Sequence, residues 1–325
     1  LILTHGHEDH IGAIPYVFRQ INVPIYATRL TAGLVESKLA EIQMLDKVQI
    51  FKKEAGDSFT LGCFEVEMIH VNHSIPDSVA FGIRTPLGNV VHTGDFKIDP
   101  SPIEKKIIDL ARFGNLGMEG VLALLIDSTN VERHGYSESE SIVGKKFESH
   151  FAGCKKRIII TTFASNVHRI QQVLNVAHKY ERKVAITGRS MENVMRLSIE
   201  MGYIDVPPDT LIDISKIKNY PPEKIVVVTT GSQGESMSAL YRMAFSGHRQ
   251  VEIGAADRVI ISASAIPGNE KTVARVINEL FSKGAEVLYA AVEEIHVTGH
   301  ACQEELKIIT ALTKPKYFIP VHGEQ

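Results

Sequence analysis

The sequence predicts an α/β protein that contains two different kinds of β-sheet. Residues 1 to about 130 mix strand-like hairpins with a few helices. Further along, apolar strands alternate regularly with helices, a pattern typical of a doubly wound parallel sheet. A chain of 325 residues that is 44% hydrophobic is long enough for about two domains of roughly 150 residues each.

In the first part, the strand-like stretches are rich in β-branched and aromatic residues. They are PIYAT (24–28), KVQIFKK (47–53), FTLGCFEVEMIHV (59–71) and SVAFGIRTPLGNVVHTGD (78–95). Pro86 to Asn89 supply the turn of a hairpin within the last stretch. These elements predict layers of sheet and helix for this part of the chain.

The second part begins at SESE (137–140), a pattern that predicts a capping box opening a helix. Its expected strands are RIIITT (157–162), KVAIT (183–187), KIVVVTT (224–230), RVIISAS (258–264) and AEVLYA (285–290), with helices near 165–180, 190–202, 235–245 and 268–283. After residue 295, HVTGHA, a helix and the strand KYFIPV (316–321) lead to His322. We therefore expect domain segments over 1–137, 138–295 and 296–325.

Composition and the chain ends narrow the classes of function. The net charge of −3 predicts no general basic surface, so a polyanion would need a local site. Cys63, Cys154 and Cys302 lie far apart without CxxC spacing, which predicts neither a disulfide framework nor a thiolate metal site. No membrane span or signal peptide is visible, so we expect a cytoplasmic protein. The strand-like start at Leu1–Leu3 and the stop at PVHGEQ predict a fragment of a longer protein.

The stretch LTHGHEDHIGAIP (3–15) gathers three histidines and two carboxylates within six positions. His5 and His7 are two apart in extended chain, so their rings project to the same side. Asp9 and His10 follow where the backbone turns into a helix. Such a pattern predicts a metal site, since imidazole suits zinc and the added carboxylate also admits manganese.

The helix after this bend is expected to begin near Gly12. Pro15 is tolerated only in a first turn, which sets the start of the helix. Ile11, Ile14 and Phe18 would then face the core.

One metal ion cannot use all of these ligands, so further ligands are expected at the ends of strands. His73, Asp95 and His322 each follow an apolar strand and precede a turn, where a rigid sheet presents a side chain at the mouth of a site. His70 and His92 lie close by and are alternatives, although a position inside a strand is the preferred interpretation for both.

With these residues assembled, the chain resembles the metallo-β-lactamase superfamily, whose pattern is HxHxDH followed by a distant His, an Asp and a last His. The parallel-sheet insertion is similar to the β-CASP branch of nucleic-acid nucleases. The likeness to the bacterial ribonuclease J family rests on LLIDSTNVERHGYSESE, TFASNVHRIQQ, TTGSQGESMSALYRMA, SASAIPGNE and HVTGHACQEELK. It implies a partial metallo-β-lactamase αββα sandwich with an inserted β-CASP domain, and residues 296–325 returning to the first domain.

The resemblance also implies the ligands of two divalent metal ions, with zinc favoured and manganese as an alternative. The first ion would be held by His5, His7 and His73, the second by Asp9, His10 and His322, with Asp95 bridging them. The β-CASP motifs fall on Asp127, His300 and His322. Thr298 stands where the family usually has serine, and the family's opening strands and C-terminal assembly domain are missing from this sequence.

These residues predict two-metal hydrolysis of a phosphodiester. His300 would donate a proton to the departing sugar oxygen, oriented by the carboxylate of Asp127, and Asp9 completes the expected catalytic set. The alternative for His300 is a contact to phosphate without proton transfer.

Substrate binding is expected at loops of small polar residues that follow the parallel strands, because helix N-termini with free N–H groups bind anions. The candidate contacts are Ser232, Ser264, His296, Val297, Thr298, Gly299 and His300. Phe163 either stacks a base or is a core aromatic.

The resulting hypothesis is a ribonuclease that cuts single-stranded RNA from the 5′ end and also internally, in RNA processing and decay. The alternatives are a DNA-acting β-CASP nuclease, a non-catalytic β-CASP scaffold subunit and a small-molecule hydrolase. The expected partners are RNA, a homodimer or homotetramer of the full-length protein and an RNA-decay complex, with no membrane.

Overall fold

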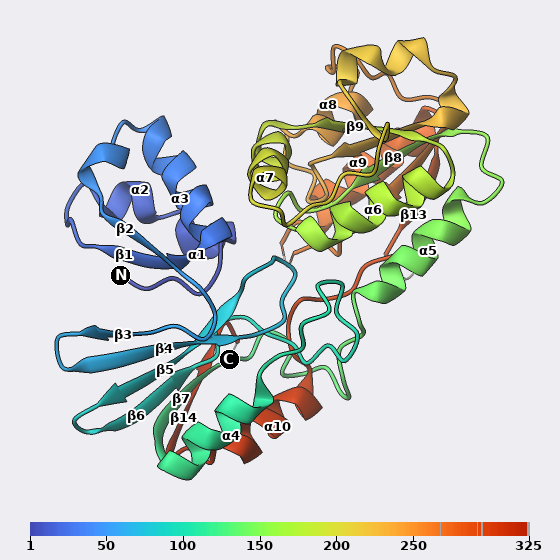
Figure 1. Cartoon of the computed structure of the whole chain (residues 1–325). Coiled ribbons are helices and arrows are strands. Elements are labelled where there is room, and N and C mark those ends of the chain that lie inside the picture. Colours follow the sequence, from blue (N-terminus) through green and yellow to red (C-terminus); the bar gives the residue numbers. More distant parts are fainter. Residues whose placement is uncertain (267, 291, 294, 324–325) are drawn as a thin grey trace. The chain divides into compact units, whose positions relative to one another are not determined.

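The computed structural model describes residues 1–266, 268–290, 292–293 and 295–323 (Figure 1). It divides into two compact units, Leu1–Ser139 with Thr298–Gln325, and Glu140–Val297. The domain boundaries expected from the sequence, after residues 137 and 295, fall two residues before these divisions. Pro267 of SASAIPGNE and the last two residues of PVHGEQ lie outside the described residues.

The first unit is built around a six-stranded sheet in the order β14-β7-β6-β5-β4-β3. The strands are β3 (Ser58–Leu61), β4 (Phe64–His70), β5 (Val79–Thr85), β6 (Gly88–His92), β7 (Val121–Asp127) and β14 (Tyr317–Val321). Strands β3 to β6 pair antiparallel, whereas β6, β7 and β14 pair parallel. One consequence is that β4, β6, β7 and β14 all run in the same direction and end at the same edge.

Helices cover one face of this sheet, and a smaller sheet lies on the other. Figure 1 shows α4 (Leu110–Glu119) beside α10 (Gln303–Thr313), and Phe113, Leu116 and Ile309 bury them against the strands. The smaller parallel sheet pairs β1 (Ile25–Thr28) with β2 (Ile50–Lys53), and is accompanied by α1 (Glu8–Ile11), α2 (Ile14–Val17), α3 (Arg29–Glu41) and a 3-10 turn, η1 (Leu45–Lys47).

The two sheets of the first unit meet through aromatic stacking. The Tyr26 ring on β1 stacks on Phe59 of β3, with ring centroids 4.7 Å apart, and on Phe51 of β2. Ile2, in the expected strand at the start of the chain, forms only an isolated parallel bridge with Tyr26. The layers correspond to the sandwich that the resemblance implied.

The bend after His7 differs from the prediction. The helix begins at Glu8 rather than near Gly12, because extended His7 is its N-cap and two acidic residues occupy the first turn, where the helix dipole favours negative charge. It ends at Ile11, and a second short helix starts at Ile14 with Pro15 in its first turn. Proline lacks the N–H that one continuous helix would need. The predicted burial of Ile11, Ile14 and Phe18 is confirmed.

The stretch FTLGCFEVEMIHV is also not a single strand. It forms the hairpin β3–β4, in which Leu61 pairs with Phe64. Gly62 makes the turn with a φ of 62°, a conformation that glycine adopts without the steric cost that a Cβ carries.

The second unit contains a six-stranded parallel sheet in the order β10-β9-β11-β8-β12-β13, which confirms the predicted architecture. The strands are β8 (Arg157–Thr161), β9 (Lys183–Thr187), β10 (Leu211–Ile212), β11 (Ile225–Thr229), β12 (Asp257–Ile261) and β13 (Glu286–Tyr289). The helices are α5 (Ser141–Phe151), α6 (Val167–Lys179), α7 (Arg189–Glu200), α8 (Ala239–Ala244) and α9 (Glu270–Ser282), with 3-10 turns η2 (Ile214–Asn219) and η3 (Pro222–Lys224).

The central strands β11, β8 and β12 each carry a run of buried apolar residues because both faces of the sheet are covered. Ile159, Val227 and Val259 join α8 and α9 in one core cluster. Their neighbours along the strands, such as Ile158 and Val226, point to the opposite face and are equally buried.

The predicted capping box at SESE is wrong, although a helix does follow it. Helix α5 begins at Ser141, and its N-cap, Glu140, makes no side-chain cap hydrogen bond. Ser137 instead donates its hydroxyl and its backbone N–H to Glu305, at 2.8 and 2.7 Å. The Glu140 carboxylate accepts two hydrogen bonds from Arg169. Distant charged partners therefore replace the local reciprocal bonds.

The longest helices described, α3, α6 and α9, have 13 residues each. A membrane span needs about 20 predominantly apolar residues. Within the described ranges, no helix is both long enough and apolar enough to cross a bilayer.

Candidate active site

The ends of the strands bring distant histidines and aspartates together in the first unit. His73 follows β4, Asp95 follows β6, Asp127 is the last residue of β7, and His322 comes directly after β14. These four strands end at the same edge of the sheet. The HxHxDH bend adds its own side chains at this edge, so residues separated by more than 300 positions become neighbours.

A first group of potential metal ligands consists of His5, His7, His73 and Asp95. His7 Nδ1 lies 3.1 Å from His5 Nε2 and 3.0 Å from His73 Nε2. Asp95 Oδ2 lies 3.6 Å from His5 Nε2 and 3.8 Å from His73 Nε2. The rings of His5 and His7 thus point to one place, as their spacing predicted.

A second group shares Asp95 with the first and adds Asp9, His10 and His322. His10 Nε2 is 3.2 Å from His322 Nε2 and 3.2 Å from Asp95 Oδ2. Asp9 Oδ2 lies 3.5 Å from His10 Nε2, and His322 Nε2 lies 3.6 Å from Asp95 Oδ1. The two oxygens of Asp95 therefore face ligands of both groups.

The donor sets fit divalent metal ions. Ligand atoms within each group lie within 4.8 Å of one another. The shortest distances between ring nitrogens, 3.0 to 3.2 Å, are close to the roughly 3.3 Å that separates two imidazole ligands of one tetrahedral zinc. Imidazole nitrogens with carboxylate oxygens are ligands that both zinc and manganese accept.

Burial keeps most of these imidazoles in the form that binds metal. Desolvation and the neighbouring imidazoles hold the pKa of His5 and of His73 well below the usual value. Burial likewise lowers the pKa of His7 to about 4, although Asp95 and Asp9 oppose this shift. A neutral ring retains a lone pair for a metal ion.

The pKa values of Asp95 and its partner His10 shift so that both charged forms are favoured. Burial alone would raise the pKa of Asp95, but the hydrogen bond from His10 and the nearby imidazoles outweigh it and hold this pKa well below its usual range. Burial would lower the pKa of His10, yet the hydrogen bond and charge of Asp95 raise it. Asp95 is therefore ionised over the whole physiological range.

His300 and Asp127 form a pair beside the ligand groups. His300 Nδ1 lies 2.8 Å from Asp127 Oδ2 and 3.9 Å from Asp95 Oδ2. Burial opposes protonation of His300, but Asp127 and the other carboxylates outweigh it and raise the pKa of the ring. Asp127 Oδ1 accepts hydrogen bonds from the backbone N–H and hydroxyl of Thr129, at 3.1 and 2.7 Å. The carboxylate that orients His300 is thus itself held in place.

The predicted binding loops of the second unit lie after its three central strands. Phe163, Ser232 and Ser264 follow β8, β11 and β12, which are neighbours in the sheet. Gln233 joins two of these loops, because its side chain donates to the Ser264 carbonyl at 2.9 Å and accepts from the backbone N–H of Ile266 at 2.7 Å. Ser232 is buried, whereas Phe163 is half-buried.

The predicted stretch His296 to His300 divides between the units. His296 and Val297 belong to the second unit, where Arg169 donates to His296 Nδ1 at 2.9 Å and to the Val297 carbonyl at 3.3 Å. Thr298, Gly299 and His300 belong to the first unit. Their binding roles remain predictions.

The alternative ligands His70 and His92 take part in other contacts. His70 Nε2 lies 3.2 Å from the carbonyl oxygen of Lys106, and His92 Nδ1 accepts from the backbone N–H of Gly94 at 3.0 Å. Neither belongs to a metal-type group within the described ranges. Both are the last residues of strands β4 and β6, close to the expected strand-interior positions.

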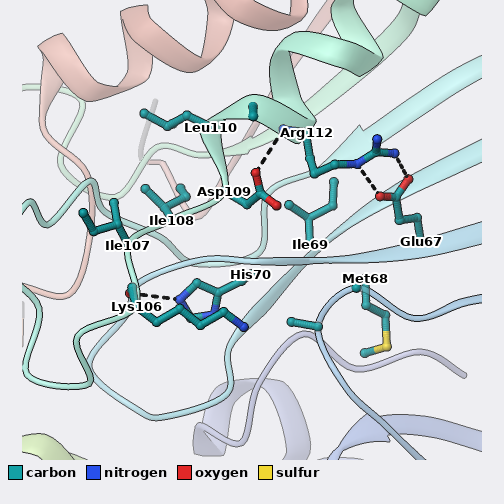
Figure 2. Close-up of a pocket in the computed structure, with 13 residues that line it drawn as sticks. Glu67, Met68, Ile69, His70, Lys106, Ile107, Ile108, Asp109, Leu110 and Arg112 are labelled. Carbon is teal, nitrogen blue, oxygen red and sulfur yellow. Dashed lines mark hydrogen bonds and ion pairs between the residues drawn. The ribbon is translucent and has the colours of Figure 1, made fainter.

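A separate pocket of about 660 Å³ lies between the end of β4 and residues 106–112. Figure 2 shows its wall, with Arg112 directed at Glu67 and His70 turned toward Lys106. Arg112 Nε lies 2.6 Å from a Glu67 carboxylate oxygen. His70, one of the two alternative ligands, lines this pocket, whereas no member of the two ligand groups does, and the charged pair Arg112–Glu67 is already internally satisfied.

The sequence reasoning missed Thr4 and Asn130, and it named Gly299 only as a substrate contact and not as a partner of His73. Thr4 Oγ1 lies 3.0 Å from His5 Nδ1 and 3.5 Å from His10 Nδ1, and its position directly before the HxHxDH bend was the available signal. The Gly299 carbonyl lies 2.8 Å from His73 Nδ1. Asn130 contacts Thr298 and His300, and no local pattern distinguishes it from an ordinary loop residue.

Three family models match successive parts of the chain. Residues 1–126 match the metallo-beta-lactamase superfamily, and residues 155–280 match the beta-CASP domain of ribonuclease J. Residues 285–325 match the Zn-dependent metallo-hydrolase RNA specificity domain. Fold and matches together define a metallo-β-lactamase protein of the β-CASP type.

Curated relatives extend the comparison to the whole chain. Proteins named Ribonuclease J from Helicobacter pylori and Thermus thermophilus are 47% and 46% identical over 100% and 99% of this chain, which covers 47% and 57% of their lengths. Ribonuclease J2 of Bacillus subtilis is 39% identical over 100% of this chain and 58% of its own length. The chain is therefore similar along its whole length to proteins named Ribonuclease J, and it spans about half the length of the curated relatives it matches.

A solved structure also has the same fold. A protein of unknown function from Enterococcus faecalis V583 aligns with a TM-score of 0.68, covering 99% of this chain and 74% of the other. Its sequence identity of 17% limits the comparison to the fold.

Proposed function

We propose that this chain is the catalytic core of a metal-dependent ribonuclease that hydrolyses phosphodiester bonds of single-stranded RNA. The observation that carries the proposal is the convergence of two ligand groups that share Asp95, directly beside the His300–Asp127 pair. The relatives named Ribonuclease J support RNA as the substrate.

Two divalent metal ions are the proposed cofactors, with zinc favoured over manganese because histidine nitrogens predominate among the donors. His5, His7 and His73 would hold one ion and Asp9, His10 and His322 the other, with Asp95 contributing to both. Paired divalent ions supply an activated water molecule and stabilise charge on the phosphate.

His300 is the proposed general acid. Its Nδ1 faces Asp127, so the imidazolium has its Nε2–H available for the departing sugar oxygen. The raised pKa of His300 increases the protonated fraction near neutral pH. When the P–O bond breaks, that proton passes to the leaving oxygen and the ring becomes neutral.

The loops after β8, β11 and β12 are the proposed binding site for the RNA 5′ end. Ser232 and Ser264 would donate to phosphate oxygens and Phe163 would stack a base. His296 to His300 would bind backbone phosphates near the cut. This arrangement underlies the proposed 5′→3′ exonuclease activity with additional internal cleavage.

Digestion of matched single-stranded RNA and DNA by the zinc-loaded protein tests the function. We expect cleavage of RNA and much slower cleavage of DNA. Comparable rates on both would favour a DNA-acting nuclease, and the absence of cleavage with two bound metal ions would favour the non-catalytic scaffold. Cytoplasmic location, a homodimer or homotetramer and an RNA-decay complex remain predictions.

A further inference from the structure

The side chain of Asn130 ties the loop after β7 to the segment Thr298–His300. Its amide nitrogen Nδ2 donates to Thr298 Oγ1 at 2.9 Å and to the His300 carbonyl at 3.1 Å. The backbone N–H of His300 also donates to Thr298 Oγ1, at 3.2 Å. Asn130 is buried, so water competes little for these bonds. One amide group therefore holds the Thr298 side chain and the His300 backbone, on either side of Gly299.

The same loop also holds the ring of His300. Asp127 precedes Asn130 by three residues, and its Oδ2 lies 2.8 Å from His300 Nδ1. Asp127 thus fixes the orientation of the imidazole, while Asn130 fixes the position of its backbone. A general acid needs both, because proton transfer requires a donor within hydrogen-bond reach of the leaving oxygen.

Gly299, which lies between Thr298 and His300, contacts the first ligand group. Its carbonyl oxygen lies 2.8 Å from His73 Nδ1, and His73 Nε2 lies 3.0 Å from His7 Nδ1. A carbonyl can only accept, so the proton of neutral His73 lies on Nδ1 and leaves Nε2 as the lone-pair donor for a metal ion. A Cβ at position 299 would come within 2.8 Å of the His73 ring, so only glycine permits this approach.

We propose that Asn130 is a positioning residue that couples the general acid to the metal ligands. Through one amide group it places the backbone of His300, and through the Gly299 carbonyl it maintains the metal-binding tautomer of His73. The inference rests on the proposed function for the part that concerns His300, whereas the part that concerns His73 can be tested without RNA.

The first test is the affinity for Zn²⁺, measured by competition with a chromogenic chelator. Asn130→Asp keeps the size of the side chain but replaces the donor by a carboxylate that repels the His300 carbonyl. We expect zinc to bind on the order of 10-fold more weakly at the site that contains His73, with activity on RNA reduced by roughly 10- to 100-fold through kcat rather than KM. Asn22→Asp is the matched control, since Asn22 also donates to a backbone carbonyl of the first unit, that of Lys47.

A second variant distinguishes a specific effect of the lost hydrogen bond from misfolding. Thr298→Val removes the oxygen that accepts from Asn130 and His300 while preserving the shape of the side chain. The single variants Asn130→Ala and Thr298→Val both remove the Asn130–Thr298 hydrogen bond, so the double variant should lose less zinc affinity than the sum of the two single losses. Thermal unfolding of the metal-free proteins checks that each variant folds.

Zinc affinity and kcat within twofold of the unsubstituted protein in both folded Asn130→Asp and Thr298→Val would overturn the proposal. A lower unfolding temperature without a change in either quantity would assign Asn130 a purely structural role and would also overturn it. If the unsubstituted protein binds zinc but cuts no RNA, the proposed function fails, while the zinc titration still decides the effect on His73.

Discussion

The two sets of predicted site residues differ in what holds them in place. In the first unit, ionisable side chains from the ends of four strands contact one another, and Asp95 faces both ligand groups. In the second unit, Phe163, Ser232 and Ser264 lie on separate loops, and the described contact between two of these loops comes from Gln233. One substitution in the first set therefore disturbs several partners, whereas one in the second changes a single loop. The comparison predicts effects of very different size.

The largest effect is expected for Asp95→Asn. This change removes the charge shared by both groups, so we expect fewer than two zinc ions per chain and roughly a 10⁴-fold loss of RNA hydrolysis, equivalent to several kcal/mol. Elemental analysis by mass spectrometry and timed RNA digestion measure the two effects. Asp46→Asn, on the exposed surface of the same unit, is the control. Retention of two zinc ions would show that the groups are independent of Asp95.

A smaller effect is expected for His300→Ala. Loss of the general acid should lower kcat by on the order of 10²–10⁴ while the metal content stays at the unsubstituted level. His134→Ala replaces an exposed histidine of the same unit and should leave the rate unchanged. Loss of zinc from His300→Ala would instead make His300 a metal ligand, as its proximity to Asp95 and Asp127 also allows.

The first unit should show a pH dependence of stability that comes from one buried carboxyl group, that of Glu104. Burial raises the pKa of Glu104 to about 7, while Asn72 donates to its carboxylate at 2.9 Å. The folded state therefore keeps a proton that the unfolded chain has released above its pKa of about 4.3. Stability attributable to this group is present at low pH and declines as the pH rises toward 7, by roughly 3 kcal/mol in total.

Glu104→Gln should remove that decline. The variant is expected to match the unsubstituted protein near pH 4.5 and to unfold at a higher temperature at pH 8, as measured by circular dichroism of the metal-free proteins. Glu41→Gln, at an exposed position, is the control. An equal pH dependence in both proteins would show that Glu104 is not the group responsible.

The smallest effect is expected in the second set. A charge-assisted contact to a terminal phosphate is worth about 1.5–3 kcal/mol, so RNA with a 5′-monophosphate should be degraded about 10- to 150-fold faster than RNA with a 5′-hydroxyl. Ser264→Ala should reduce that ratio by roughly 2- to 10-fold and spare internal cleavage. Ser282→Ala on α9 is the control. Products released first from the 3′ end would exclude the proposed polarity.

Short-range patterns accounted for much of the fold and for the common direction of the His5 and His7 rings. The HxHxDH spacing placed His5 and His7 on the same side, and the ring nitrogens lie 3.1 Å apart. The alternation of apolar strands and helices predicted the parallel sheet. Both predictions succeeded because side-chain direction in an extended strand and apolar periodicity depend only on neighbouring residues.

Other expectations failed where distant residues compete with local ones. Ser137 and Glu140 match a capping box, yet Glu305 and Arg169 bind them instead. A buried carboxylate needs several donors, and Glu305 obtains them from the distant Ser137 and Ile98 as well as from nearby Cys302. The role of Asn130 was equally inaccessible, because its partners lie about 170 residues further along the chain.

The amino-acid sequence by itself determined which chemistry is available: imidazoles and carboxylates at a bend, small polar loops after parallel strands, and the family these patterns resemble. Only the tertiary structure decided that His73 lies at the ligand groups while His70 and His92 contact backbone groups and belong to neither group within the described ranges. The physical reason is that the strand register and the common edge of β4, β6, β7 and β14 select the side chains that converge. A one-residue shift would direct each strand's side chains to the opposite face.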